Sequence, residues 1–240
     1  MPNPTAAMLV IGDEILSGRT RDANMHHLAQ VLTERGIDLK EVRVVSDDAD
    51  AITEAVRALS AAYTHVFTSG GIGPTHDDIT ADNVARAFGV PIDVREDARG
   101  LLEAHYAKSD QVLNEARLRM ARIPDGATLI DNPVSTAPGF TLENVHVMAG
   151  VPAIFTAMVE SLMPRLTGGA PVVSRTLKVM RPEGDVAGPL GDLAKRYPAL
   201  SMGSYPFQLQ GAFGTNLVLR GTDPAEVDAA MAELEKALAE

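Results

Sequence analysis

Short apolar runs alternate with amphipathic stretches along the first half of the chain, and this alternation restricts the fold more than any other feature. The run at residues 7–11 ends at a glycine, as expected for a strand that is buried on both faces. The stretch 26–36 then places Leu28, Val31 and Leu32 on one helical face. Repeated strand-helix pairs with short connections predict a mainly parallel sheet covered by helices on both faces. In such sheets ligands bind beyond the carboxyl ends of the strands.

The order of elements changes near residue 171. From there to the C-terminus the pattern predicts a strand, a helix, two strands and a final helix, which is a small βαββα domain. The final helix has Asp223 as a candidate N-cap, followed by Pro224 and, at the third position, Glu226. We expect two domains, residues 1–168 and 171–240, joined by small residues that interrupt the apolar periodicity.

Composition excludes several classes of protein. The chain has no cysteine, so any metal would be held by oxygen or imidazole ligands. The formal net charge of -11 argues against binding to a nucleic-acid backbone, which relies on clustered lysine and arginine. No apolar stretch approaches the roughly 20 residues of a membrane span, and the N-terminus lacks signal-peptide features. We therefore expect a cytoplasmic protein that binds neither membranes nor nucleic acid.

The stretch TSGGIGPTHDDIT, Thr68 to Thr80, carries most of the candidate chemistry. Its glycines would let backbone amides approach a bound phosphate, and Ser69 and Thr75 add hydroxyl groups. The spacing matches neither a dinucleotide fingerprint nor a P-loop. A purely structural tight turn is an equally good interpretation of Gly70, Gly71 and Gly73 on these grounds.

Two adjacent aspartates follow these glycines. Asp77 and Asp78 precede a predicted helix, so one of them can cap it. The second carboxylate would repel the first unless a cation or a proton intervenes. Asp13 and Glu14 lie in the loop after the first strand, at the same edge of the predicted sheet. Such oxygen ligands favour Mg²⁺, Mn²⁺ or a similar ion, shared with substrate phosphates.

Other polar residues have two interpretations. Asn24 could cap the helix that follows it or reach the ligand, and Asp50 is a candidate cap for the helix at residues 51–62. Residues 127–140 predict a strand and a Pro/Gly-rich loop, in which Asn132 is either a turn residue or a ligand contact.

Three motifs in this order, GDEILSGRTRDAN, SGGIGPTHDDIT and DNPVSTAPGF, resemble the N-terminal domain of the competence/damage-inducible protein A (CinA) family. That domain is similar to the molybdopterin-binding MoaB/Mog fold, which implies a three-layer α/β domain. The tail is similar to the small domain that follows in CinA-like proteins and in some FAD synthases. The resemblance also implies a divalent metal such as Mg²⁺, Mn²⁺ or Co²⁺ and self-association into a homo-oligomer.

The resemblance implies roles for individual residues. The three glycines would cradle the ligand, and Asp78 would be the main catalytic or metal-binding carboxylate. In the pyrophosphate cleavage that we expect, Asp77 or Asp13 would hold the metal together with Asp78. The supporting residues would be Asp13, Glu14 and Asn24. Either Asp47 or Asp48 matches the acidic position that Mog-like proteins use after the second strand.

The chain departs from the family pattern in two places. Longer CinA proteins carry a C-terminal nicotinamide-nucleotide deamidase domain, so we expect no such activity from these 240 residues. The family's Pro-Gly-x-Pro-x-Glu-Met loop reads AGVPAIF, with Ala149 and Ile154 in place of its first proline and its glutamate.

Three functions are compatible with this pattern. The first is metal-dependent cleavage of a dinucleotide pyrophosphate such as ADP-ribose or FAD. The second is molybdopterin binding, with or without adenylyl transfer, in molybdenum-cofactor biosynthesis. The third is a nucleotide-binding module without catalysis. All three place a phosphate-linked nucleotide or pterin ligand at the same edge of the sheet.

Overall fold

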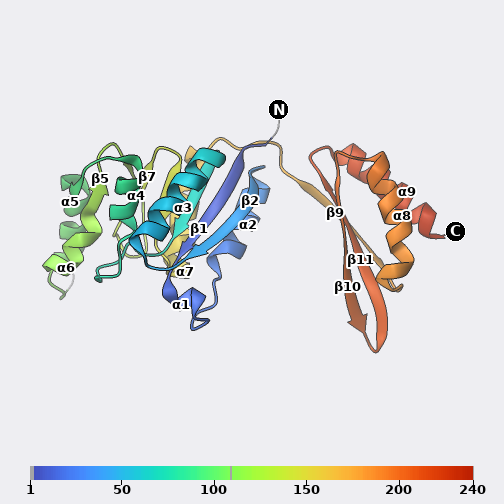
Figure 1. The fold of residues 1–240 in the computed structure, drawn as a ribbon, viewed down its shortest axis with the longest axis horizontal. Helices are drawn as coiled ribbons and strands as arrows, with labels where there is room; N and C mark the ends of the chain where they lie inside the picture. Colours follow the sequence, from blue (N-terminus) through green and yellow to red (C-terminus); the bar gives the residue numbers. More distant parts are fainter. Residues whose placement is uncertain (1–2, 109, 240) are drawn as a thin grey trace. The chain divides into compact units, whose positions relative to one another are not determined.

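The computed structural model describes residues 3–108 and 110–239. The chain forms two compact units, Met1–Gly169 and Ala170–Glu240 (Figure 1). The first unit contains a six-stranded sheet, and the second contains a three-stranded sheet.

The elements of the first unit follow one another in the order strand, helix, strand that the sequence predicts. They are β1 (Thr5–Ile11), α1 (Asp13–Leu16), α2 (Asn24–Glu34), β2 (Asp38–Val45), α3 (Ala49–Ala62), β3 (His65–Ser69), α4 (Thr80–Phe88), β4 (Ile92–Val94), α5 (Glu96–Tyr106), α6 (Glu115–Leu118), a 3₁₀ turn (Arg119–Ala121), β5 (Arg122–Pro124), β6 (Thr128–Ile130), β7 (Gly139–Leu142), β8 (Val145–Met148), α7 (Pro152–Leu162) and a second 3₁₀ turn (Met163–Arg165).

The large sheet has the strand order β2-β1-β3-β8-β7-β6. Strands β2, β1, β3 and β8 are parallel, whereas β7 pairs antiparallel with both β8 and β6. The mostly parallel sheet that the sequence predicts is confirmed. The antiparallel strand β7 was assigned to a loop, and the short antiparallel pair β4-β5 was also missed.

Helices cover both faces of this sheet, as predicted. Strand β1 divides its side chains between two cores, because successive residues of a strand point to opposite faces. Leu9 packs in the core that includes α3 and α4, whereas Met8 packs in the core that includes α2 and α7. Both side chains are fully buried. The three-layer arrangement therefore follows from a strand that is apolar at every position from Ala6 to Ile11.

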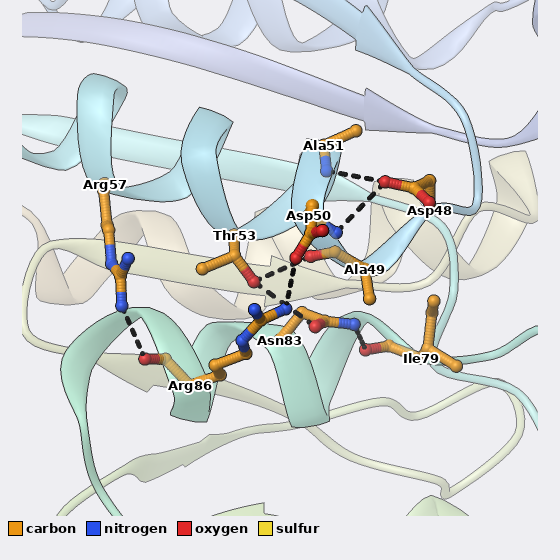
Figure 2. Close-up of polar contacts among 9 residues, drawn as sticks. All are labelled: Asp48, Ala49, Asp50, Ala51, Thr53, Arg57, Ile79, Asn83 and Arg86. Atoms are coloured by element: carbon orange, nitrogen blue, oxygen red, sulfur yellow. Dashed lines mark hydrogen bonds and ion pairs between the residues drawn. The ribbon is translucent and has the colours of Figure 1, made fainter.

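Polar contacts fix α3 and α4 beside each other (Figure 2). Asp48 caps α3 by accepting from the amides of Asp50 and Ala51, at 3.1 and 2.9 Å. The prediction that Asp50 is the cap is wrong, because the helix begins earlier, at Ala49. The Asp50 carboxylate instead pairs with Arg86 of α4 at 2.8 Å.

The same interface positions the start of α4. The Thr53 hydroxyl of α3 donates to the carbonyl of Ala49 at 2.8 Å or to Asn83 Oδ1 at 3.3 Å, and the side chains of Thr53 and Asn83 are buried. Asn83 in turn donates to the carbonyl of Ile79 at 2.8 Å, directly before α4 (Figure 2). The end of the glycine loop is thereby tied to two helices that rest on the sheet.

The second unit has the predicted element order. Its elements are β9 (Val173–Val179), α8 (Glu183–Arg196), β10 (Ser201–Leu209), β11 (Ala212–Gly221) and α9 (Pro224–Ala239). The sheet is antiparallel, in the order β10-β11-β9, and the apolar face of α9 is buried against it together with α8. Asp223 accepts from the amide of Ala225 at 2.9 Å, which supports its assignment as the cap of α9. Among the described residues, no helix has the length and apolarity that a membrane crossing requires.

Candidate functional site

A cavity of about 530 Å³ opens at the carboxyl edge of the large sheet. The loops that follow β1, β2, β3 and β8 contribute Gly12, Asp47, Gly70 and Gly150 to its lining. These loops belong to four neighbouring parallel strands, so the cavity lies where ligands bind in parallel sheets. The predicted residues that line it are Glu14, Asp47, Gly70, Gly71, Gly73, Asp77, Asp78 and Asn132.

The glycines are required by close approaches of the backbone. Gly70 has φ 110°, and a Cβ on it would overlap with the carbonyl oxygen of Ile11. Gly71 has φ 69°, and a Cβ there would overlap with the hydroxyl group of Thr80. A left-handed conformation in such confined space admits only glycine. The glycine turn is therefore structural, and it also leaves the backbone of the cavity wall without covering side chains.

Asp78 closes the turn after the glycines. Its Oδ2 accepts from the amide of Thr75 at 2.8 Å and from the Thr75 hydroxyl at 2.5 Å. The prediction that Asp77 or Asp78 caps α4 is wrong, because the helix begins at Thr80 and no side chain caps it. Asp78 instead folds back toward Gly73, where a Cβ would lie 2.6 Å from the carboxylate. Thr75 thus supports Asp78 and does not line the cavity.

Asp77 is exposed beside Asp78. Hydrogen bonding by the Thr75 hydroxyl lowers the pKa of Asp77, and its own backbone amide and the charge of His76 act in the same direction. The single proton of this hydroxyl serves one carboxylate at a time, and the geometry favours Asp78. Asp77 is therefore ionised at neutral pH unless a ligand perturbs it.

A second pair of loops adds negative charge to the cavity. Asp47 Oδ2 accepts from the amide of Asp13 at 2.9 Å. Burial raises the pKa of Asp47, as do the neighbouring charges of Asp13, Glu14 and Asp77, while this hydrogen bond acts in the opposite direction. The side chain of Asp13 is exposed and does not line the cavity, although its amide positions Asp47.

The donor set fits a cation only in part. Among the described residues, no three histidine, aspartate or glutamate side chains gather closely enough to enclose a metal ion. Mg²⁺ usually needs only one or two carboxylates, because water and substrate phosphates complete its coordination. Asp78 with Asp77, or Asp47 with Glu14, could hold such an ion together with a phosphate ligand.

Asn24 and Ser69 lie behind the cavity wall. Asn24 Nδ2 donates to Ser69 Oγ at 2.7 Å and to the carbonyl of Gly150 at 2.8 Å, so it ties three loops together. Neither Asn24 nor Ser69 lines the cavity. Asn24 does not cap α2, since Asp22 accepts from the amides of Asn24 and Met25. Within the described part of the chain, the buried Oδ1 of Asn24 has no hydrogen-bond partner.

Asn132 lines the cavity but its polar atoms are engaged in its own loop. Its Nδ2 donates to Ser135 Oγ at 2.7 Å and to the carbonyl of Ala137 at 2.8 Å. Its Oδ1 accepts from the amides of Val134 and Ser135, both at 3.1 Å. The turn interpretation of Asn132 therefore accounts for every polar atom of its side chain.

Sequence reasoning missed a basic group beside Asp78. Arg119 donates to the Asp78 carbonyl at 3.4 Å and lines a small pocket that shares Gly71, Gly73 and Asp78 with the main cavity. Arg122 lines the same pocket, but Asp82 pairs with it at 2.5 Å. The arginine-rich run at residues 117–122 was the available signal, and nothing in its spacing pointed to the glycine loop.

With this geometry established, comparison with known proteins identifies the family. The family model described as "Probable molybdopterin binding domain" matches residues 7–168. The chain belongs to this family. A second model, "FAD synthase, middle domain", matches residues 171–240. The molybdopterin-binding-type domain thus coincides with the unit that holds the cavity.

Several relatives share this domain. Protein PH0439 of Pyrococcus horikoshii is 35% identical, over 80% of this chain and 80% of that protein. The "Probable FAD synthase" of Caenorhabditis elegans is 32% identical over 98% of this chain, which spans 50% of that longer protein. The crystal structure of CinA from Thermoplasma acidophilum, a protein with unknown function, superposes with a TM-score of 0.63 and 34% identity, covering 68% of this chain and 97% of that one. The CinA resemblance is confirmed.

Proposed function

We propose that the cavity binds and hydrolyses the pyrophosphate of a dinucleotide such as ADP-ribose or FAD, with the help of a divalent metal ion. The observation that carries this proposal is the charge of the cavity lining. Among the described residues, this lining includes four carboxylates, Glu14, Asp47, Asp77 and Asp78, and no lysine or arginine.

Electrostatic repulsion favours a phosphate that is bound through a metal ion over one that is bound by backbone amides alone. Two like charges about 4 Å apart repel by about 4 kcal/mol at an effective dielectric constant of about 20. A hydrogen bond from the glycine loop to a charged phosphate contributes only about 1.5–3 kcal/mol. Backbone amides alone cannot offset several carboxylates, so an anionic ligand requires a cation at this edge.

Each residue then has a defined task. Asp78, preorganised by Thr75, would hold the cation together with Asp77, and the backbone of Gly70 and Gly71 would contact phosphate oxygens. When bound, the metal would supply charge neutralisation and a lower pKa for a coordinated water. Asp47, whose pKa is raised, is the carboxylate best suited to accept a proton from the attacking water.

The direct test is phosphorus NMR of ADP-ribose and FAD incubated with the purified protein. Separate reactions contain Mg²⁺, Mn²⁺ or Co²⁺ and are quenched with EDTA before the spectrum is recorded. We expect two monophosphate products with at least one metal and none with EDTA from the start. Intact substrates under every metal would overturn the proposal.

A matched pair of variants assigns the activity to the cavity. Asp78→Asn removes a lining carboxylate, whereas Glu54→Gln removes an exposed carboxylate of α3 that does not line the cavity. We expect turnover to disappear in the first variant and to persist in the second. Equal loss in both would show that the cavity is not the site.

A second candidate is binding of molybdopterin, with or without adenylyl transfer. The description of the matching family favours it, since residues 7–168 fit the probable molybdopterin binding domain. Calorimetric titration with the pterin and with ADP-ribose would rank the two ligands. Tight pterin binding together with intact ADP-ribose would favour this candidate, and binding of either ligand without turnover would indicate a non-catalytic module.

A further inference from the structure

The small sheet of the second unit has one face that no helix of its own unit covers. Helices α8 and α9 both pack on the face that contains the buried residues Leu217 and Leu219 of β11 (Figure 1). Because side chains alternate along a strand, Val218 and Arg220 point to the opposite face. We call this opposite face the open face.

Cross-strand register shows what the open face presents. Tyr205 of β10 lies opposite Asn216 of β11, which lies opposite Lys178 of β9. Four residues further along β11, or about 13 Å, Arg220 belongs to the same face. Strands β9, β10 and β11 contain no aspartate or glutamate. In a chain with a formal net charge of -11, a sheet without carboxylates is a marked local exception.

Two aromatic rings on the open face lie against glycines. A Cβ on Gly214 would overlap with the ring of Phe207. A Cβ on Gly203 would lie 3.2 Å from both Cε2 and the hydroxyl oxygen of Tyr205. Covering a glycine in this way stabilises a strand, which explains why the rings lie down on the sheet. It does not explain why Tyr205 remains 50% exposed. The outer side of this ring is available for stacking.

The cations of the two faces differ in their partners. On the face toward the helices, Arg175 pairs with Asp228 of α9 at 2.8 Å. On the open face, no carboxylate among the described residues pairs with Lys178 or Arg220, and the Lys178 Nζ lies 4.6 Å from the centre of the Phe207 ring. The open face therefore combines an exposed π surface with two cations that form no ion pair with any described carboxylate.

We infer that the open face of the β9–β11 sheet binds a nucleobase that carries a phosphate, with the base stacked on Tyr205 and the phosphate held by Lys178 or Arg220. Stacking on aromatic side chains with basic groups nearby is the general chemistry of nucleotide and single-strand recognition on open sheets. We assign the face to a free mononucleotide, because the formal net charge of -11 disfavours a polyanionic strand. The inference does not depend on hydrolysis in the first unit.

The experiment is an NMR titration of the full-length, ¹⁵N-labelled protein. The probes are AMP, adenosine, ribose 5-phosphate and a single-stranded RNA of about eight nucleotides. We expect AMP to shift amide signals of β9, β10 and β11, and adenosine and ribose 5-phosphate each to bind more weakly than AMP. RNA binding that is no more than about tenfold tighter than AMP binding would support a free mononucleotide, and tighter RNA binding would overturn that assignment.

Matched variants separate this site from general effects. Tyr205→Leu keeps an apolar cover over Gly203 but removes the π surface, and its control is Phe213→Leu, a 63% exposed aromatic on the other face. We expect AMP binding to weaken about tenfold in the first variant and to stay unchanged in the second.

The cationic residues are tested by a second pair of variants. Lys178→Gln combined with Arg220→Gln should weaken AMP binding but leave adenosine binding unchanged, while Lys195→Gln on α8 should change neither. This pair keeps the inference testable if Tyr205→Leu fails to fold. AMP-induced shifts confined to residues 3–169, or equal weakening in a variant and its control, would overturn the inference.

Discussion

Both edges of the large sheet carry a cavity, but polar groups are used differently at each. The cavity at the carboxyl edge has a volume of about 530 Å³ and is lined by carboxylates that repel one another. The cavity at the amino edge has a volume of about 300 Å³ and is lined by His65, Thr141 and His146. There, Thr141 Oγ1 lies 3.0 Å from His146 Nδ1, and His146 Nε2 lies 3.2 Å from His65 Nδ1.

The difference indicates where the protein can bind a ligand. At the amino edge the polar atoms satisfy one another, and Asn144 likewise donates to the carbonyls of Ser60 and Tyr63. At the carboxyl edge, burial and the charges of Asp13, Glu14 and Asp77 raise the pKa of Asp47, and a cation or a proton would relieve this repulsion. The carboxyl edge is therefore where we propose that the ligand binds, and the amino edge is where polar contacts between side chains would add stability.

The largest effect is expected for Asp78→Asn at the carboxyl edge. Loss of this carboxylate should lower the rate of pyrophosphate hydrolysis by more than about 100-fold, since removing even indirect metal contacts costs 10- to 100-fold. Rates of the variant and of Glu54→Gln are compared at saturating Mg²⁺. Retention of more than a tenth of the activity would remove Asp78 from the proposed mechanism.

Alanine substitutions of glycines test how closely other atoms approach the Cα atom at each position. Gly70→Ala should cost about 3 kcal/mol or more, because it strains a left-handed residue and also displaces the carbonyl of Ile11. Gly126→Ala is the matched control, since Gly126 has φ 82° but no atom within 4 Å of the added methyl group. It should cost only about 1–2 kcal/mol.

Chemical denaturation measures both free energies of unfolding. Equal costs for the two glycine variants would show that the close approach at Gly70 does not restrict the loop.

The buried His146 at the amino edge should make the free energy of unfolding depend on pH. Burial lowers the pKa of His146 to about 3, and the neighbouring His65 acts in the same direction. The native state thus keeps His146 neutral, while the unfolded state takes up a proton below pH 6.5. The stability that comes from the buried neutral His146 is complete above pH 6.5, and it is lost as the pH falls toward 3.

Between pH 6.5 and pH 5 this loss amounts to about 2 kcal/mol. Denaturation of the wild type and of His146→Phe at both pH values measures it. The variant should be less sensitive to pH over this range, although its lost hydrogen bonds lower its stability at pH 7. The same pH sensitivity in both proteins would contradict a buried neutral His146.

The smallest effect on the free energy of unfolding is expected from the repulsion between carboxylates at the carboxyl edge. Asp47→Asn should raise the free energy of unfolding at pH 7 by about 0.5 kcal/mol, because it removes repulsion from Asp13, Glu14 and Asp77. Asp48→Asn is the control, since asparagine caps a helix as well as aspartate does. Lower stability of Asp47→Asn would mean that its hydrogen bond to the Asp13 amide outweighs the repulsion.

The fold was predictable wherever local periodicity agreed with tertiary packing. Strand β1 is apolar from Ala6 to Ile11 and is buried there on both faces, and the apolar face of α9 is buried as its spacing indicates. Strand β7 escaped prediction because Gly139 reads as a turn residue. In the structure, a Cβ on Gly139 would overlap with the carbonyl of Val147, so this glycine permits close strand pairing.

The site was predictable in its location and only partly in its details. The glycine loop and its acidic residues could be found from sequence because they follow a buried strand. The engagement of Asp78 by Thr75, and of Asn24 by Ser69 and Gly150, depends on turn geometry and on contacts between distant loops. Side-chain capping rules therefore wrongly offered Asn24 as the cap of α2, and Asp77 or Asp78 as the cap of α4.

Calorimetric titration with the α,β-methylene analogue of ADP-ribose tests the central claim most directly, because this ligand binds without being cleaved. The wild-type protein is titrated with the analogue in the presence of Mg²⁺ and in the presence of EDTA, and Asp78→Asn is titrated under the same two conditions. The account predicts binding to the wild type that requires Mg²⁺ and is lost in Asp78→Asn. Equal binding with Mg²⁺ and with EDTA would contradict a metal-bridged phosphate site at the carboxyl edge.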